Sequence, residues 1–210
     1  MINSYDNVVF DFGGVIFDID PGVCLEKLES IGLREAASLL DPYCQKGDFL
    51  ALEQGEISAA EFFDRLRAGT PSPHPSDKEM EEALCSFIIR LPVRRLKALR
   101  YIRSTGKRLF ALSNTNPIMY NNVIDKLFRQ EGLAINDYFE GIVTSFAEKV
   151  CKPNPEIFQI LLRRYRLDPS RTVFIDDSIT NVRAAENCGI KGFHLPENTD
   201  FIEALNLKID

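Results

Sequence analysis

Short apolar runs that end abruptly at polar or glycine residues are the feature that most constrains how this chain can fold. The first run, 8–10, is bounded by Asp11 and the Gly13-Gly14 pair, a pattern typical of a buried strand that ends in a turn. Two further runs end in the same way, and two weaker ones resemble them. The sequence therefore predicts strands over 8–10, 108–112, 141–144, 172–175 and 192–195.

Segments with the apolar spacing of helices lie between these runs. Apolar residues recur at helical spacing over 92–104 and 155–165. Ser178 is a suitable N-cap for a further helix that stops at Gly189. Strands that alternate with helices predict an α/β fold, a doubly wound parallel sheet covered on both faces. In such sheets, ligands bind beyond the carboxyl ends of the strands.

The stretch from about 18 to 89 shows helix-like patterns but no convincing strand. Ser58 and Glu61 have the spacing of a capping box at the start of one helix, and 70–77 is a proline-rich loop. We therefore expect a helical insert between the first strand and the rest of the sheet. Its candidate helices are 25–31, 35–40 and 59–66. The predicted parts are an α/β core of 1–15 and 90–210 and a helical insert of 16–89.

Charge and cysteine content narrow the class of protein. The 210 residues carry a net charge of −6 without a run of like charges, whereas a nucleic-acid-binding protein needs a basic face. The N-terminal segment lacks a basic leader and has acidic residues within its apolar stretch, so we expect neither a signal peptide nor a membrane span. Five cysteines without a C-x-x-C pair favour reduced thiols. These features predict a cytoplasmic protein with no nucleic-acid or membrane partner.

Polar side chains stand at the carboxyl ends of the predicted strands. Asp11 follows the first run, Ser113 the second, and the Asp176-Asp177 pair the fourth. Lys152 begins the segment that leads from the third run into the following helix. Because parallel strands end at one rim of a sheet, we expect these side chains to converge there.

The chemistry of these groups is complementary. A carboxylate can attack phosphorus and form an aspartyl-phosphate, and several carboxylates that meet at one point favour a hard cation such as Mg²⁺. The metal, a lysine and a hydroxyl together offset charge on transferring phosphoryl oxygens. Asp176 and Asp177 would repel each other and lose hydration if buried alone, and a metal ion removes that objection. The sequence thus predicts a phosphoryl-transfer site.

Each of these positions also has a structural alternative. Asp11 with the glycines after it forms an ordinary turn in many proteins. Ser113 has the side chain of an N-cap for a helix that begins near Pro117. Lys152 could be an ordinary solvated lysine. The four positions taken together favour the functional interpretation.

Four segments in order, VVFDFGGVI, LFALSNTN, KPNPEIF and FIDDSITN, resemble the four motifs of the haloacid dehalogenase superfamily. The resemblance is to its phosphatase-like branch with a helical cap after the first strand, and it spans nearly the whole chain. It implies a Rossmann-like core and makes the insert a cap. Glu53 and Gly55 lie in an E-x-G-x-I-S segment similar to one in caps of this branch. We expect a structural role for it, with Gly55 turning the chain and Ser58 starting a helix.

The resemblance implies a metal site that binds Mg²⁺. Asp11 is then the nucleophile and a metal ligand, the backbone carbonyl of Gly13 is a second ligand, and Asp177 is the third. Asp176 acts close by, through water or by holding Lys152. No nucleotide or flavin cofactor is expected, because the sequence has neither G-x-G-x-x-G nor a P-loop.

The resemblance also implies which groups bind the phosphate. Ser113 hydrogen-bonds the phosphoryl group, assisted by the backbone around Asn114, and Gly14 lies beside the substrate. Lys152 pairs with the nucleophile and with the phosphate. Asn181 matches the trailing polar position of the last motif.

The sequence departs from most phosphatases of this superfamily at Gly13. They carry an aspartate two residues after the nucleophile, which protonates the leaving alcohol and later activates water. General acid-base help is worth ~10²- to 10⁴-fold, so its absence predicts slow turnover or a substrate whose leaving group needs little protonation. Asp18 and Asp20 are the nearest acidic substitutes.

The predicted function is Mg²⁺-dependent hydrolysis of a small phosphate monoester, such as a sugar phosphate, through an aspartyl-phosphate on Asp11. Two alternatives remain open, a phosphomutase and a non-catalytic regulator that binds a phosphorylated metabolite. Dehalogenation is less favoured, because the resembling dehalogenases need no metal and lack the paired aspartates. The sequence does not indicate the oligomeric state.

Overall fold

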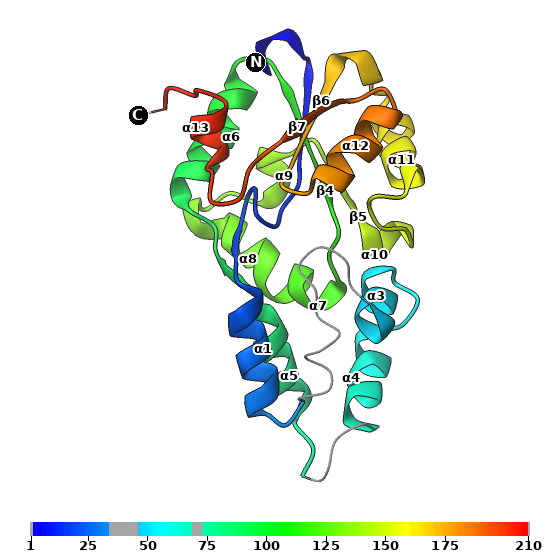
Figure 1. Ribbon diagram of the computed structural model, residues 1–210. Helices are drawn as coiled ribbons and strands as arrows, with labels where there is room; N and C mark the ends of the chain where they lie inside the picture. Colours follow the sequence, from blue (N-terminus) through cyan, green and yellow to red (C-terminus); the bar gives the residue numbers. More distant parts are fainter. Residues whose placement is uncertain (1, 34–45, 69–72, 210) are drawn as a thin grey trace.

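A parallel β-sheet forms the centre of the molecule (Figure 1). The computed structural model describes residues 2–33, 46–68 and 73–209. The strands of the sheet are β1 (Asn7–Phe10), β4 (Arg108–Ser113), β5 (Gly141–Thr144), β6 (Thr172–Asp176) and β7 (Lys191–His194). They pair in parallel in the order β5-β4-β1-β6-β7. This arrangement confirms the predicted doubly wound α/β sheet.

Helices cover both faces of the sheet (Figure 1). One face packs against α6 (Val93–Ser104), α9 (Ile135–Tyr138) and α13 (Phe201–Ala204). The opposite face packs against α11 (Pro155–Tyr165) and α12 (Ile179–Asn187). The shorter helical segments of this part are η1 (Ile2–Ser4), α7 (Pro117–Met119), η2 (Tyr120–Ile124), α8 (Asp125–Phe128), η3 (Arg129–Glu131), α10 (Ser145–Glu148) and η4 (Pro169–Arg171).

The buried strand β1 contributes to the apolar cores on both faces. Side chains alternate along a strand, so Val8 and Phe10 point to one face and Val9 to the other. Phe10 packs edge-on against Phe201 of α13, with ring centroids 5.2 Å apart. This double burial explains why the strand is a continuous apolar run, as is typical of a parallel sheet covered on both sides.

A helical insert with its own apolar core follows β1. It contains α1 (Pro21–Ser30), α3 (Gly47–Glu53), α4 (Ala59–Ala68) and α5 (Asp77–Cys85). Its core includes Leu28, Phe62 and Met80, and Ile118 and Met119 of α7 belong to the same cluster. The insert therefore rests on α7, at the carboxyl ends of the sheet strands (Figure 1).

Two short strands mark where the chain enters and leaves the insert. They are β2 (Asp18–Ile19) and β3 (Ile88–Arg90), which pair in an antiparallel manner. The expectation of no strand between 18 and 89 is therefore wrong at both ends. Strands of two and three residues are too short to carry an alternating pattern that can be recognised in a sequence.

Most helix predictions agree with the structure. The helix predicted over 155–165 has these bounds in α11, and the capping box at the start of α4 is present, with Glu61 N–H donating to Ser58 Oγ and Ser58 N–H to Glu61. The sequence pattern did not predict α3 or α5. The helix predicted over 35–40 lies outside the described residues.

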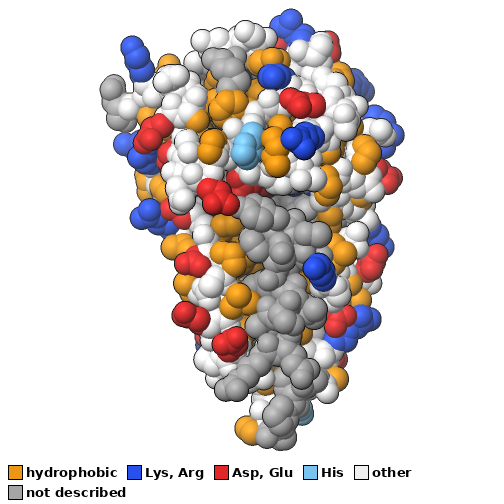
Figure 2. Space-filling model, viewed as in Figure 1, with side chains coloured by type: hydrophobic (Ala, Val, Ile, Leu, Met, Phe, Trp, Pro, Cys, Tyr) orange, Lys and Arg blue, Asp and Glu red, His pale blue; other side chains and the backbone are white. Residues whose placement is uncertain are grey.

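The charged surface residues and the cysteines can be placed in the structure. Lys and Arg are interspersed with Asp and Glu on the face seen in Figure 2. Within the described ranges, no helix has the length and hydropathy to cross a membrane. Cys24, Cys85, Cys151 and Cys188 are free thiols, and Cys44 lies outside the described residues.

Candidate active site

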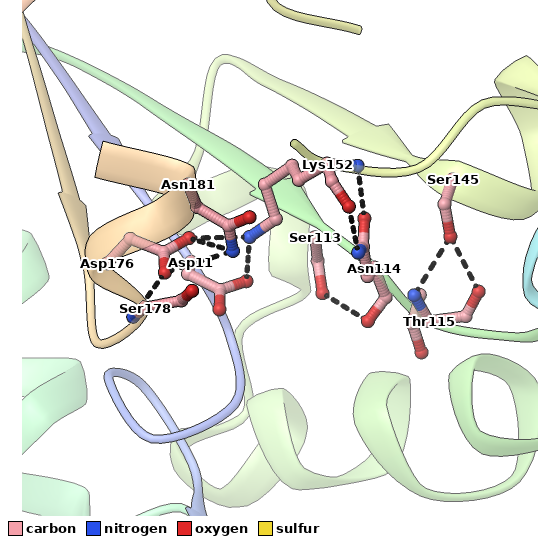
Figure 3. A network of polar contacts seen from close by, with 9 residues as sticks. All are labelled: Asp11, Ser113, Asn114, Thr115, Ser145, Lys152, Asp176, Ser178 and Asn181. Atoms are coloured by element: carbon pink, nitrogen blue, oxygen red, sulfur yellow. Dashed lines mark hydrogen bonds and ion pairs between the residues drawn. The ribbon is translucent and has the colours of Figure 1, made fainter. Parts of the chain in front are cut away.

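Three neighbouring strands bring Asp11, Ser113 and Asp176 to one edge of the sheet (Figure 3). Strand β1 lies between β4 and β6, and the Asp11 N–H donates to the Ile175 carbonyl at 2.9 Å. Asp11, which directly follows β1, is 8% exposed, Ser113 1% and Asp176 0%. Two carboxylates this deeply buried need a compensating charge.

Lys152 supplies that charge. Its Nζ lies 2.8 Å from Asp11 Oδ1 and 2.7 Å from Asp176 Oδ2, and the residue is 4% exposed. Although burial acts to lower it, these two carboxylates raise the pKa of Lys152 above its ordinary value. A reciprocal pair of hydrogen bonds joins the backbone of Lys152 to the Asn114 side chain, at 2.8 and 2.9 Å. The solvated-lysine alternative is therefore wrong.

Asp176 is held by several donors besides Lys152 (Figure 3). Its Oδ1 accepts from the Ser178 N–H at 2.7 Å, and Asn181 Nδ2 lies 3.2 Å from both carboxylate oxygens. These contacts come from the first turn of α12, directly after the strand. With both oxygens engaged, Asp176 fixes the position of the lysine.

Asp177 lies against the glycine turn that follows β1. Gly14 has a φ of +69°, and a Cβ at this position would collide with the Asp177 carboxylate. Glycine is therefore required here both by the backbone conformation and by the close approach. Gly13 has no such restriction, since the nearest atom to an added Cβ is 3.6 Å away, on Ile19.

The acidic groups of this edge fit a divalent cation. One carboxylate oxygen from each of Asp11, Asp176 and Asp177 lies within 4.8 Å of the others. Burial raises the pKa of Asp11 to about 8. Lys152 opposes this shift, and the neighbouring Asp176 and Asp177 add to it. Burial and Asp176 likewise raise the pKa of Asp177 to about 6. The raised pKa values mean that the site lacks enough positive charge to keep these carboxylates ionised. Mg²⁺, which prefers oxygen ligands, can supply that charge.

A cavity opens between this edge and the helical insert. Asp11, Ser113, Lys152 and Asp177 line it on the core side. Apolar side chains make up much of the remainder. They are Phe12, Phe17, Ile19, Phe49, Phe87, Ile88, Met119 and Ile124. A polar end opposite apolar walls suits a small ligand with one strongly charged group.

Ser113 is not a helix cap. Its hydroxyl donates to the Asn114 carbonyl at 3.3 Å, whereas Asn116 caps α7 by accepting from the Met119 N–H. The Ser113 side chain lines the cavity beside Lys152. This position agrees with a group that contacts a bound phosphate.

The two expected substitutes for the missing acid have other partners. Asp18 forms ion pairs with Arg90 and Arg95, and despite some burial these guanidinium groups lower its pKa. Asp20 is exposed and caps α1 through the backbone N–H groups of Gly22 and Val23. Neither residue lines the cavity with Asp11, so the structure does not place a proton donor at either position.

The sequence pattern did not place Ser145 or Glu53 in the site. Ser145 Oγ accepts from the Thr115 N–H and donates to its carbonyl, which fixes the loop after β4. Glu53, from the insert, lines the cavity. The E-x-G-x-I-S segment was the available signal for Glu53, but nothing in its spacing shows which way the glutamate faces.

Comparisons with known proteins give this arrangement a family. A model for haloacid dehalogenase-like hydrolases matches residues 5–189. A D-ribitol-5-phosphate phosphatase from Bacteroides thetaiotaomicron is 34% identical over 192 residues, which cover 91% of this chain and 92% of that protein. A phosphorylated carbohydrates phosphatase from Thermotoga maritima is 27% identical over 191 residues, which cover 88% of this chain and 82% of that protein.

Solved structures agree with the sequence comparisons. A crystal structure of a mutant HAD family enzyme from Bacteroides thetaiotaomicron, in complex with magnesium and inorganic phosphate, has a TM-score of 0.91 and 31% identity. The match covers 96% of this chain and 98% of that chain. The wild-type enzyme with the same ligands gives a TM-score of 0.88. The chain described here belongs to the haloacid dehalogenase-like hydrolase family.

Proposed function

We propose that this protein is a Mg²⁺-dependent phosphatase that hydrolyses a small phosphorylated metabolite through an aspartyl-phosphate on Asp11. The observation that supports it most directly is the buried Lys152 ammonium shared by Asp11 and Asp176, with the Asp177 carboxylate alongside. The named relatives are phosphatases, and similar structures contain magnesium and phosphate. The enzyme is thus a phosphoric monoester hydrolase with Mg²⁺ as its cofactor.

Asp11 is the nucleophile in this proposal. The ion pair between Lys152 Nζ and Asp11 Oδ1 holds the carboxylate in a fixed orientation at the cavity wall. An Asp11 oxygen attacks phosphorus, and the bond from phosphorus to the ester oxygen breaks as the alcohol leaves. Water then attacks the aspartyl-phosphate, which releases inorganic phosphate and restores the Asp11 carboxylate.

Lys152 and Ser113 hold the phosphoryl group. The ammonium offsets negative charge on the phosphoryl oxygens, and the Ser113 hydroxyl can turn from the Asn114 carbonyl to donate to one of them. The Asn114 side chain is committed to the backbone of Lys152. We therefore assign Asn114 a contact through its backbone, and Gly14 a place beside the substrate.

Asp11, Asp177 and the backbone carbonyl of Gly13 are the proposed metal ligands. Asp176 holds Lys152 instead, because both of its oxygens already accept hydrogen bonds. When bound, Mg²⁺ offsets the negative charge of the carboxylates and of the transferring phosphoryl group.

We propose that residues 16–89 act as a cap over a core of 1–15 and 90–210. The cavity is bounded on one side by the core and on the other by residues of the insert, including Phe49, Glu53 and Phe87. Enclosure excludes water and selects the substrate. A phosphorylated sugar or polyol is the substrate class that the two phosphatase relatives support.

A screen of phosphorylated metabolites tests the proposal. D-ribitol 5-phosphate, sugar phosphates and p-nitrophenyl phosphate are assayed for phosphate release with Mg²⁺ and with EDTA, beside Asp11→Asn. We expect release that requires Mg²⁺ and falls at least about 10³-fold in the variant, as for other essential nucleophiles. An isomerised sugar phosphate without free phosphate would identify a phosphomutase, and tight binding without turnover a regulator, and either result would contradict the proposal.

A further inference from the structure

We infer that Glu53, carried into the cavity by the helical insert, is the general acid-base group of the site and fills the role left open at Gly13. This inference rests on the proposed phosphatase function. It assigns Glu53 a proton transfer to the leaving group and a proton abstraction from water.

The position of Glu53 is the first observation. It is the last residue of α3 and lines the same cavity as Asp11, Ser113 and Lys152. Helix α3 lies next to α10, at the carboxyl ends of the strands (Figure 1). Asp11 and Glu53 thus approach the cavity from the core and from the insert, so that a phosphate ester bound at Asp11 would have its leaving group on the insert side.

The second observation is that the Glu53 carboxyl group has no hydrogen-bond or ion-pair partner among the described residues. Among the described residues, the carboxyl groups that line the cavity belong to Asp11, Glu53 and Asp177. Asp11 is bound by Lys152, and Asp177 is a proposed metal ligand. Glu53 forms neither a hydrogen bond nor an ion pair with any part of the chain that the structure describes. It is therefore the carboxyl group of the cavity whose proton is free to move.

The environment of Glu53 brings its pKa close to neutral pH, where acid-base catalysis is most effective. Burial raises the pKa of Glu53 to about 7, with Lys152 opposing the shift. At neutral pH both protonation states are then populated, so one group can act as acid in one step and as base in the next. The charged or titratable groups that face it are Lys152 and Cys151 from the loop before α11, and Asp11 and Asp177 across the cavity.

A tight contact between the insert and the core holds Glu53 in place. Gly55, two residues further on, has a φ of +60°, and a Cβ there would collide with the carbonyl group of Phe146 in α10. The chain after α3 therefore lies directly against the core backbone. A glycine at this position allows the approach that brings the end of α3 to the cavity.

The proton transfers balance over the two steps. In the first, the neutral Glu53 carboxyl gives its proton to the ester oxygen as the bond to phosphorus breaks and Asp11 becomes phosphorylated. In the second, the Glu53 carboxylate takes a proton from water while the water oxygen bonds to phosphorus and the bond between phosphorus and the Asp11 oxygen breaks. Inorganic phosphate leaves, and both carboxyl groups return to their starting states.

Leaving-group dependence tests the inference, with Glu53→Gln as the variant and Glu56→Gln as a matched control from the same turn. Glu56 is exposed and does not line the cavity. The alcohol of an alkyl phosphate needs a proton to leave, whereas p-nitrophenolate does not. We expect Glu53→Gln to slow phosphorylation of Asp11 by an alkyl phosphate ~10²- to 10³-fold. We expect the p-nitrophenolate burst to keep its rate within about threefold and to be followed by slower steady-state turnover, because the base is missing.

Two further results separate a catalytic role from a structural one. The decline of kcat/KM for alkyl phosphates above about pH 7 is expected in the wild type and Glu56→Gln, and is expected to be absent in Glu53→Gln. Glu53→Asp, which keeps the acid, is expected to restore part of the activity. Equal losses for alkyl and aryl phosphates in the phosphorylation step, or a raised KM with unchanged kcat, would overturn the inference. A wild type that releases no phosphate from any ester would instead contradict the phosphatase function itself.

Discussion

At the scale of single residues, the site depends on one ammonium shared between buried carboxylates. Lys152 contacts Asp11 and Asp176, and the Asn114 side chain holds the lysine backbone in place. Removing one partner from such a network leaves uncompensated charge in a largely buried site. The structural consequence of a substitution here is therefore as large as the catalytic one.

Replacing Lys152 by methionine tests that coupling. In the absence of metal at pH 8, Lys152→Met is expected to lower the free energy of unfolding by about 3–5 kcal/mol. The loss is expected to be smaller at pH 5, because burial raises the pKa of Asp11 to about 8 and that group then carries a proton. Urea unfolding at both pH values measures the effect. Lys97→Met, at an exposed position of α6, is the control, and equal losses for the two variants would refute the coupling.

The glycine turn after β1 offers a second prediction. Gly14→Ala is expected to displace the Asp177 carboxylate and to weaken Mg²⁺ binding about 10- to 100-fold, the usual effect of disturbing the support of a metal ligand. Gly132→Ala is the matched control, because Gly132 has a φ of +76° and an added Cβ there meets no atom within 4 Å. Titration calorimetry with Mg²⁺ compares them, and unchanged affinity in Gly14→Ala would exclude Asp177 from the metal site.

The sequence was informative about those side chains whose position follows from a strand end. Asp11, Ser113 and Asp176 come together because their strands are neighbours in a parallel sheet. The alternation of strands with helices along the sequence predicts such a sheet. Asp18 and Asp20 illustrate the limit, since closeness along the chain placed them near the nucleophile. Their actual partners depend on side-chain directions that the sequence pattern does not contain.

At the scale of secondary-structure elements, the contact between α3 and α10 couples the insert to the catalytic edge. Gly55 lies against the Phe146 carbonyl, and Phe49 and Glu53 of the same helix line the cavity. Any displacement of this contact therefore moves the insert side of the cavity relative to the nucleophile. The sequence pattern predicted a structural role for the segment that contains Glu53 and did not place Glu53 at the cavity, because its location depends on how two distant elements pack.

Gly55→Ala tests this coupling. The added Cβ is expected to push the end of α3 away from α10 and to lower kcat/KM for an alkyl phosphate about 10- to 100-fold, as misplacement of a catalytic group does. Gly106→Ala is the control, because Gly106 has a φ of +85° and an added Cβ there meets no atom within 4 Å. Both variants are expected to lose about 1 kcal/mol of stability from backbone strain. Similar kinetics in the two variants would show that the contact does not position the site.

Very short strands were the hardest elements to predict. The 11 residues of α11 carry a full apolar stripe, and its predicted bounds are correct. The two and three residues of β2 and β3 carry no usable period, and these strands were missed. Helix α5 begins with a capping box of Ser76 and Glu79, a signal that the sequence contained but the preceding proline-rich segment obscured.

At the scale of the whole molecule, protonation, metal binding and folding are linked. Burial raises the pKa of Asp11 to about 8 and that of Asp177 to about 6, above the ordinary values of aspartate. The metal-free folded state therefore binds more protons than the unfolded state between about pH 4 and pH 8, and its stability decreases as the pH rises through that range. A bound cation favours the ionised carboxylates and reverses this loss.

Thermal unfolding measures that linkage. With EDTA, Tm is expected to fall between pH 5 and pH 8 in the wild type, and the slope is expected to be shallower in Asp11→Asn, which cannot titrate at that position. Added Mg²⁺ is expected to raise Tm more at pH 8 than at pH 5, because fewer protons must be displaced. A Mg²⁺ effect that is larger at pH 5 would contradict the assignment of these carboxylates as ligands.

The central claim is that Asp11 receives the phosphoryl group. Acid quenching during turnover of p-nitrophenyl phosphate with Mg²⁺, followed by mass spectrometry of the digested protein, tests it most directly. The account predicts one phosphoryl group on the peptide that contains Asp11 in the wild type, and none in Asp11→Asn. Turnover at the normal rate with the phosphoryl group on another residue, or on no residue at any quench time, would contradict it.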